Sequence, residues 1–179
     1  MKIKNRFLVL FLMLAGFAPH MAGAQQTADD FLHQGLGFFQ RGDFDRAIAS
    51  YNEAIKLNPN FTNTFFHRGL AHFFLSNWNQ AIEDFTQVIR LDPNYVRAFF
   101  NRGLTHFHMN NWNQAIADFT QVIRLDPNYV RAFFHRGLAH SYLFDWNQAI
   151  ADFEAVLRLD PNHQRARDYI QIARVVRGW

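Results

Sequence analysis

Residues in the middle of the chain form two sets at helical spacing. The first set comprises Phe99, Arg102, Gly103 and His106, and the second, after Asn110 and Asn111, comprises Ala115, Phe119 and Val122. Intervals of three and four residues place side chains on one face of an α-helix. The pattern therefore predicts two helices separated by a short polar turn.

This two-helix pattern returns every 34 residues. The stretch DFTQVIRLDPNYVRAFF occurs at residues 84–100 and again, unchanged, at 118–134. Three residue types keep the same period in all repeats: Pro59, Pro93, Pro127 and Pro161; Gly35, Gly69, Gly103 and Gly137; Ala47, Ala81, Ala115 and Ala149. A fixed period of this length is typical of helical units that stack and bury their apolar faces together. We predict four helix hairpins, at residues 28–61, 62–95, 96–129 and 130–163, with the small residues allowing close helix packing.

The expected helix ends carry their own signals. In three repeats an Asn or Asp stands three residues before a Gln, at Asn77 and Gln80, Asn111 and Gln114, and Asp145 and Gln148. This spacing predicts capping boxes at the starts of the second helices. Asp-Pro-Asn follows Leu91, Leu125 and Leu159. Because proline disfavours helical geometry in the preceding residue, we expect the second helices to stop there.

Paired charges also follow the period. Arg68, Arg102 and Arg136 each precede the repeat glycine, and Asp84, Asp118 and Asp152 follow sixteen residues later. The first repeat has Gln34 and Ser50 at these positions, so both charges are absent together. A buried charge is costly unless it is matched. We predict that each Arg pairs with its Asp between the two helices of a hairpin.

These features together resemble the tetratricopeptide repeat (TPR) family, in its exported bacterial form. The matching positions are the opening aromatics Phe65, Phe99 and Phe133, the Gly and Ala series, the second-helix aromatics Tyr51, Phe85, Phe119 and Phe153, and the closing prolines. The resemblance implies an all-α, right-handed superhelical solenoid of antiparallel helix hairpins. Four TPR repeats would form a domain at residues 25–163, and residues 164–179 would form a C-terminal capping helix. Two departures are His72, His106 and His140 in place of a large aromatic, and a turn glycine kept only as Gly42.

The resemblance also implies a non-catalytic scaffold that binds a protein or peptide in a groove lined by the first helices. Helical spacing predicts an apolar groove with arginines at its rim, formed by Phe66, Leu70, Phe73, Arg97, Phe100, Leu104, Phe107, Arg131, Phe134 and Leu138, and extended by Ser141. TPR proteins that hold the acidic tails of heat-shock chaperones present Lys and Asn where these Phe and Leu residues stand, so we do not expect that partnership. The alternative for the aromatic residues is packing between adjacent repeats.

The first 24 residues differ from the rest. A basic head, MKIKNR, precedes an apolar run from Phe7 to Phe17 and the small residues Ala22, Gly23 and Ala24. This order is typical of a cleaved secretory signal peptide, and the run is shorter than the roughly 20 residues that span a membrane. We expect residues 1–24 to be removed. The mature chain would then act in the periplasm or outside the cell, without a stable membrane anchor.

Removal of this segment changes the charge balance. The 179-residue chain has 18 Lys and Arg against 15 Asp and Glu, but Lys2, Lys4 and Arg6 lie in the expected signal peptide. The remaining 15 basic and 15 acidic residues balance, which removes the electrostatic argument for a nucleic-acid partner. The sequence has no cysteine, so stability has to come from packing and not from disulfides.

Residues that could support catalysis or metal binding are poorly placed. After the expected cleavage site the serines are Ser50, Ser76 and Ser141, none of them in a nucleophile-elbow sequence, and no glycine-rich phosphate loop is present. We therefore expect no enzyme activity and no cofactor. Two alternatives to a peptide-binding scaffold remain. One is a self-associating structural scaffold, and the less favoured one is a metal- or pH-responsive binder built from His33, His67 and His135. We expect His72, His106 and His140 to be half-buried and hydrogen-bonded.

Overall fold

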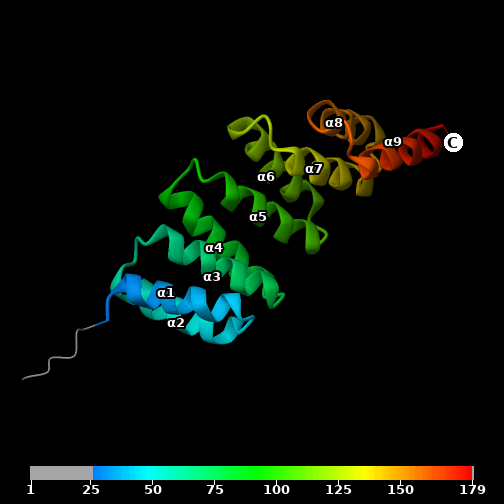
Figure 1. The fold of residues 1–179 in the computed structure, drawn as a ribbon. Coiled ribbons are helices and arrows are strands. Elements are labelled where there is room, and N and C mark those ends of the chain that lie inside the picture. Colours follow the sequence, from blue (N-terminus) through cyan, green and yellow to red (C-terminus); the bar gives the residue numbers. More distant parts are fainter. Residues whose placement is uncertain (1–25, 179) are drawn as a thin grey trace, which may run out of the picture.

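The computed structural model describes residues 26–178, which contain nine helices and no strand. The helices are α1 (Ala28–Gln40), α2 (Phe44–Leu57), α3 (Thr62–Phe74), α4 (Trp78–Leu91), α5 (Val96–His108), α6 (Trp112–Leu125), α7 (Val130–Tyr142), α8 (Trp146–Leu159) and α9 (Gln164–Arg177). They form four antiparallel hairpins in sequence order, followed by one further helix (Figure 1). The expected signal peptide and Trp179 lie outside the described residues. Within residues 26–178, no helix combines the length and apolar character needed to cross a membrane.

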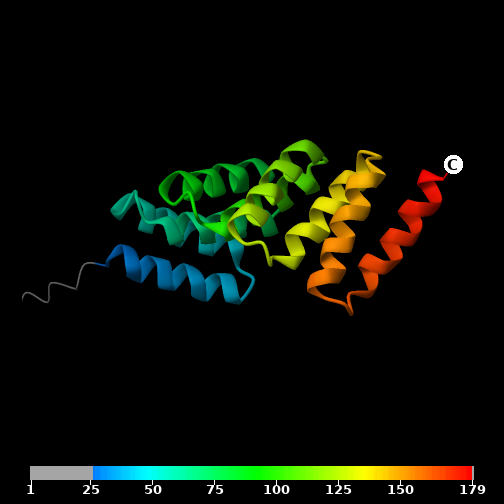
Figure 2. The ribbon, with the colours of Figure 1, turned by 90° about the horizontal axis from the view of Figure 1, so that it is seen from above.

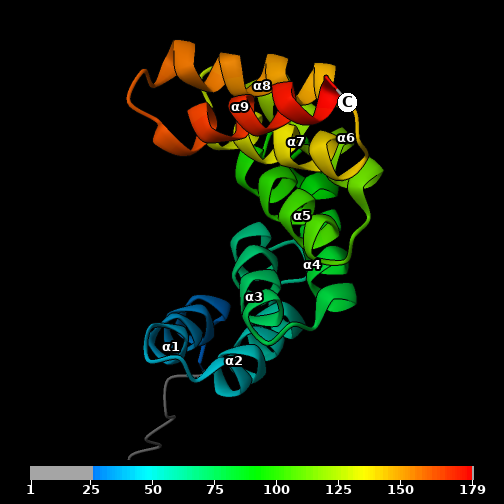
Figure 3. The same ribbon diagram turned by 90° about the vertical axis from the view of Figure 1, so that its right-hand side faces the viewer.

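The hairpins stack into a curved, twisted array, which confirms the predicted solenoid (Figures 2 and 3). Every helix contacts the next one along the chain, and the first helices of neighbouring repeats also approach each other in the pairs α1–α3, α3–α5 and α5–α7. Second helices of successive repeats do not approach one another to this extent within the described range. The first helices therefore line the inner, concave side of the curve.

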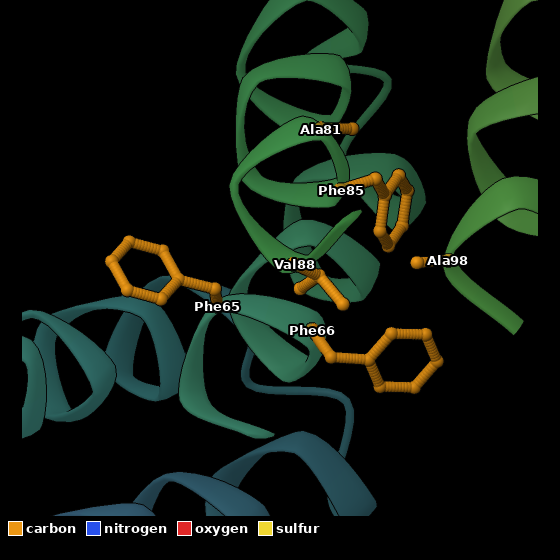
Figure 4. Packing of buried hydrophobic residues seen from close by; sticks show 6 residues of the cluster. All are labelled: Phe65, Phe66, Ala81, Phe85, Val88 and Ala98. Carbon is orange, nitrogen blue, oxygen red and sulfur yellow. The ribbon is translucent and has the colours of Figure 1, made fainter. Parts of the chain in front are cut away.

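Each repeat has its own small core, which it shares with the next repeat. In Figure 4, Phe66 of α3 points toward Ala98 of α5, and Phe85 of α4 lies beside the same alanine. Phe65, the neighbour of Phe66 on α3, points the other way. Because Ala98 is fully buried in this cluster, the second repeat does not complete its core without the third.

The repeat glycines allow the two helices of a hairpin to pack closely, as expected. A Cβ atom added to Gly103 would lie 2.8 Å from Cε1 of Phe119, and one added to Gly69 would lie 2.9 Å from Cε1 of Phe85. Real Cβ atoms essentially never make contacts this short. The second-helix aromatic ring therefore packs directly on the first-helix backbone, and only glycine leaves room for it.

The predicted ion pairs are present in repeats two to four. Arg102 donates from Nε and Nη2 to the two carboxylate oxygens of Asp118, at 2.9 and 2.7 Å. Arg68 with Asp84 and Arg136 with Asp152 have the same bidentate geometry. A third partner, which the sequence did not predict, lies in the preceding repeat: Nη1 of Arg102 donates to Thr86 Oγ1 at 3.0 Å. Nη1 of Arg68 donates to Asn52 and Nη1 of Arg136 to Thr120, so each arginine links three helices from two repeats.

The capping-box prediction was wrong at two sites and half right at the third. Asn77 and Asn111 make no side-chain cap, whereas Asp145 accepts from the backbone N–H of Gln148. The backbone N–H of all three caps already donates to the preceding helix, for example from Asn77 to the His72 carbonyl at 2.9 Å. The Gln side chain therefore has no free N–H to accept from, and a capping box cannot form.

The stop signals behave as expected. Asp92, Asp126 and Asp160 end the second helices in extended or near-extended backbone, with ψ near 90°, as the following proline requires.

Candidate functional site

Three of the predicted groove residues do not line an open surface. Phe66, Phe100 and Phe134 are only 0%, 2% and 5% exposed, so their assignment to a partner-binding groove was wrong. The centroid of the Phe100 ring lies 5.0 Å from that of Tyr129, at the end of the same repeat, and 5.7 Å from that of His135, on α7 of the next repeat. These rings fill the space between adjacent repeats, which is the alternative that the sequence left open.

The predicted rim arginines cover those buried rings. Arg97 lies over Phe66 and Arg131 over Phe100, each with its guanidinium carbon 4.7 Å from the ring centroid. Arg165, which sequence analysis did not include, lies 5.0 Å over Phe134 in the same way. We call Arg97, Arg131 and Arg165 the arginine row. All three are exposed, and none forms an ion pair with a carboxylate among residues 26–178. Arg165 follows Arg131 by the same 34 residues that separate Arg131 from Arg97, so the period would have revealed the third member.

The other predicted residues, Leu70, Phe73, Leu104, Phe107 and Leu138, are half-buried on the first helices. Phe107 belongs to an aromatic triad at the junction between two repeats, with Trp112 and Tyr142. The Phe107 and Trp112 centroids are 4.8 Å apart in edge-on geometry, and Trp112 stacks on Tyr142 at 4.4 Å. Equivalent triads occur at the two earlier junctions, formed by Phe39, Phe44 and Phe74, and by Phe73, Trp78 and His108.

The fourth junction departs from this arrangement. Trp146 occupies the position of Trp112, but Ser141 replaces Phe107 and Val176 replaces Tyr142. A pocket of about 290 Å³ opens here between α7, the start of α8 and α9. We call it the fourth-junction pocket, and it is lined by Leu138, Ser141, Tyr142, Phe144, Trp146, Tyr169, Ile172 and Ala173. Of these residues, only Leu138 belonged to the predicted groove list, with Ser141 as its extension.

Histidines beside the concave face favour the neutral form. Burial, together with the nearby Arg131, Arg165 and His108, lowers the pKa of His135 to about 4. Burial also lowers the pKa of His67, His72, His106 and His140. The last three are half-buried as predicted, but Nδ1 of His72 and of His106 has no hydrogen-bond partner within the described range. Among residues 26–178, no three His, Asp or Glu side chains gather as a metal site would require.

Comparisons with known proteins agree with the fold. The crystal structure of MamA protein is 26% identical, with a TM-score of 0.81 over 84% of this chain and 82% of that chain. The structure of YrrB, a TPR protein with an unusual peptide-binding site, is 18% identical and shares the fold with a TM-score of 0.76 over 84% and 78% of the two chains. The first TPR of Spaghetti (RPAP3), bound to an HSP90 peptide, is 25% identical and aligns over 66% of this chain and 94% of that one, with a TM-score of 0.64. A search of curated proteins gave no match.

Family models match most of the chain directly. A model described as TPR repeat matches residues 35–75 and 74–110, and two described as tetratricopeptide repeat match residues 96–129 and 130–163. Together these matches run from residue 35 to residue 163 and include most of the first hairpin and all of the other three. The chain therefore belongs to the tetratricopeptide repeat family.

Proposed function

We propose that the protein is a non-catalytic interaction scaffold that binds a peptide or helix of a partner protein on its concave face. The observation that carries this proposal is the row of half-buried apolar side chains on α3, α5 and α7, namely Leu70, Phe73, Leu104, Phe107 and Leu138, beside the unpaired arginine row. Partly exposed apolar surface next to fixed charge is typical of a protein-binding site. The buried rings of Phe66, Phe100 and Phe134 pack beneath this surface and do not contact the partner.

The peptide bound to the related TPR of Spaghetti supports this class of function. The chemistry of the two sites need not be the same, because this chain has Phe and Leu where chaperone-binding TPR proteins have Lys and Asn. We therefore propose a partner with apolar anchor side chains, oriented by contacts between its carboxylates and the arginine row.

We further propose that the scaffold is exported and acts in the periplasm or outside the cell. The support is the basic head, the apolar run and the Ala22-Gly23-Ala24 sequence at the start of the chain. Mass analysis of the protein from its native host tests this proposal. A mature N-terminus at Gln25 in a soluble extract is expected, and a membrane-bound pool that still begins at Met1 would contradict it.

Selection from a random peptide library displayed on phage tests the binding function. The mature chain should enrich peptides with spaced apolar residues, and Leu104→Asp should lose them because it places a carboxylate on the concave face. Ala117→Asp is the matched control, since Ala117 is exposed on the second helix α6 and outside this face. Enrichment that is equal for both variants would show that peptides bind elsewhere.

Self-association is a second candidate, favoured by exposed apolar residues in the second half of α9. Ile172, Val175 and Val176 are exposed there, with Ile172 and Val176 on one face of the helix. Light scattering across a dilution series separates the two candidates. A molecular mass that stays monomeric at high concentration removes the second one.

A further inference from the structure

We propose that the fourth-junction pocket binds an aromatic side chain of a partner segment that also carries carboxylates near that aromatic residue. This inference rests on the proposed function, because it specifies the chemistry of the partner held on the concave face. Three features of the pocket lead to it: a ring absent from α7, apolar walls and an adjacent exposed arginine.

The missing ring is evident from the other junctions. Phe39, Phe73 and Phe107 each present a ring edge-on to the aromatic residue that starts the second helix, at 5.3, 5.3 and 4.8 Å. At the fourth junction Ser141 takes this position, and Trp146 has no such partner from α7. The approach of α7 to α9 is also weaker than that of the earlier first-helix pairs. Phe144, from the turn before α8, meets Trp146 edge-on at a longer centroid distance of 5.8 Å, and the position of the Phe107 ring stays open. A partner's aromatic ring there would add the edge-on contact that α1, α3 and α5 supply at the other junctions.

The walls of the pocket suit such a ring. Its volume of about 290 Å³ lies just below the roughly 300–1,000 Å³ of small-molecule pockets, and is suited to one large side chain. The Ser141 hydroxyl donates to the Gly137 carbonyl at 2.9 Å, so its hydrogen is already used within α7. Tyr142, Phe144 and Ile172 are exposed beside the opening. These side chains would lose contact with water when a ring enters.

Phe144 gives independent support. It has a φ of 60°, at the turn position that Gly42, Ser76 and Asn110 occupy in the other repeats. Bulky residues rarely adopt this left-handed conformation, and such outliers gather at functional sites. The Phe144 ring is 76% exposed and lies 5.8 Å from that of Trp146. The turn therefore holds an aromatic side chain out at the edge of the pocket.

The charged residues near the pocket indicate where the carboxylates of the partner segment lie. The Arg165 guanidinium lies over Phe134, and the Phe134 ring lies 5.9 Å from that of Tyr169, which lines the pocket. Arg165 and Tyr169 are one helical turn apart on α9, so a carboxylate beside the bound aromatic residue can reach this arginine. At the other end of the pocket, Asp145 caps α8 and would repel a second carboxylate. The carboxylates are therefore expected on the Arg165 side.

Three synthetic peptides provide the test: EDGFGDE, the same peptide with alanine in place of phenylalanine, and KKGFGKK. Each carries a fluorescein label, and fluorescence anisotropy measures binding to the mature chain. The phenylalanine peptide with acidic residues should bind at least tenfold more tightly than either of the others. Arg165→Gln should weaken it severalfold and reduce the salt dependence of binding.

Ser141→Phe is the decisive variant, with Ser141→Ala as its matched control. Phenylalanine at this position copies Phe73 and Phe107, so the variant should fold, fill the pocket and bind EDGFGDE at least tenfold more weakly, whereas Ser141→Ala should bind as the parent does. Ser141→Leu serves the same purpose if circular dichroism shows that Ser141→Phe is unfolded. Equal binding by the filled and control variants would overturn the inference.

The remaining outcomes separate this inference from the proposed function. Phage-selected peptides that bind the parent and Ser141→Phe equally would leave the scaffold function intact and refute the aromatic pocket. Absence of binding by all three synthetic peptides would refute the pocket as well, while the phage selection decides the scaffold function independently. A dimer that becomes a monomer in Ser141→Phe would show that a second copy occupies the pocket, and would also overturn the proposal.

Discussion

Arg102 shows how a single side chain joins two repeats. It is 20% exposed and its partner Asp118 only 7%, so the bidentate pair is largely removed from water. Its third bond, to Thr86, reaches back into the preceding repeat. Deleting one member of such a pair leaves a buried charge without a partner, and this is more costly than losing an exposed pair.

We expect Arg102→Ala to lower the free energy of unfolding by about 3 kcal/mol, measured by urea denaturation. Arg90→Ala on the exposed side of α4 is the control and should cost less than about 0.5 kcal/mol. The double variant with Asp118→Ala should cost less than the sum of the two single changes. Strict additivity would mean that the two charges do not stabilise each other.

Phe144 brings a bulky side chain to a left-handed turn position that Gly42, Ser76 and Asn110 occupy in the other repeats. Its left-handed backbone costs about 1–2 kcal/mol for a residue with a side chain, and its ring recovers little because it is mostly exposed. Phe144→Gly should therefore raise the free energy of unfolding by about 1 kcal/mol. Gly42→Ala is the reverse experiment at φ 76° and should lose a similar amount. A loss of stability in Phe144→Gly would show that contact with Trp146 outweighs the strain.

Predictions for single residues were confirmed where the sequence allowed only one environment for the side chain. The Arg–Asp pairing followed from charges that appear or vanish together, and the glycine series from the need for close packing. Phe100 and Phe107 could not be separated in this way, because both are aromatic residues on the inner side of the same helix. How deeply each ring is buried depends on which residues of the following loop and helix cover it. Phe100 is covered by Tyr129 and His135, whereas Phe107 remains half-buried.

At the scale of elements, helix positions were predictable and helix caps were not. The period and the proline stops defined every hairpin, because periodicity and proline act through the local backbone alone. The caps at Asn77 and Asn111 depended on which acceptor their N–H groups would find, and the preceding helix supplies it. The fourth-junction pocket was also missed, since it arises from Ser141 and Val176, two residues that are ordinary when considered singly.

Helix α9 packs on the last repeat, and we expect its buried part and its exposed end to contribute differently to stability. Ala166, Ile170 and Ala173 are buried against α8, whereas residues 174–178 are exposed. A chain that ends at Ala173 loses the exposed Arg174–Glu154 pair and should lose about 1 kcal/mol or less. A chain that ends at His163 uncovers Phe153 and should lose about 3 kcal/mol or more. Thermal melts of the two truncated chains test this difference. Equal losses would mean that stabilisation comes from the end of the helix and not from its buried face.

The whole molecule combines five histidines with lowered pKa values along its first helices, and this sets its response to acid. The folded protein binds protons at these sites less readily than the unfolded chain, whose histidines titrate near 6.5. Above this pH both states are neutral at these histidines, and stability is complete. As the pH falls below 6.5 only the unfolded chain gains protons there, so the free energy of unfolding decreases. For His135 the loss continues to about pH 4, where the folded protein also binds the proton.

His135 should dominate this effect, and the repeats supply a replacement for it. Asn101 occupies the equivalent position one repeat earlier, so His135→Asn removes the titrating group with a residue that the fold already accepts there. With a folded pKa of about 4, His135 accounts for a loss of about 2 kcal/mol between pH 7 and pH 5. Urea denaturation at these two pH values should therefore show a smaller loss in His135→Asn than in the parent, by about this amount. His33→Asn, at the exposed equivalent in the first repeat, should retain the loss of the parent. Parallel losses in all three proteins would show that His135 is not responsible, and that the acid sensitivity arises elsewhere in the array.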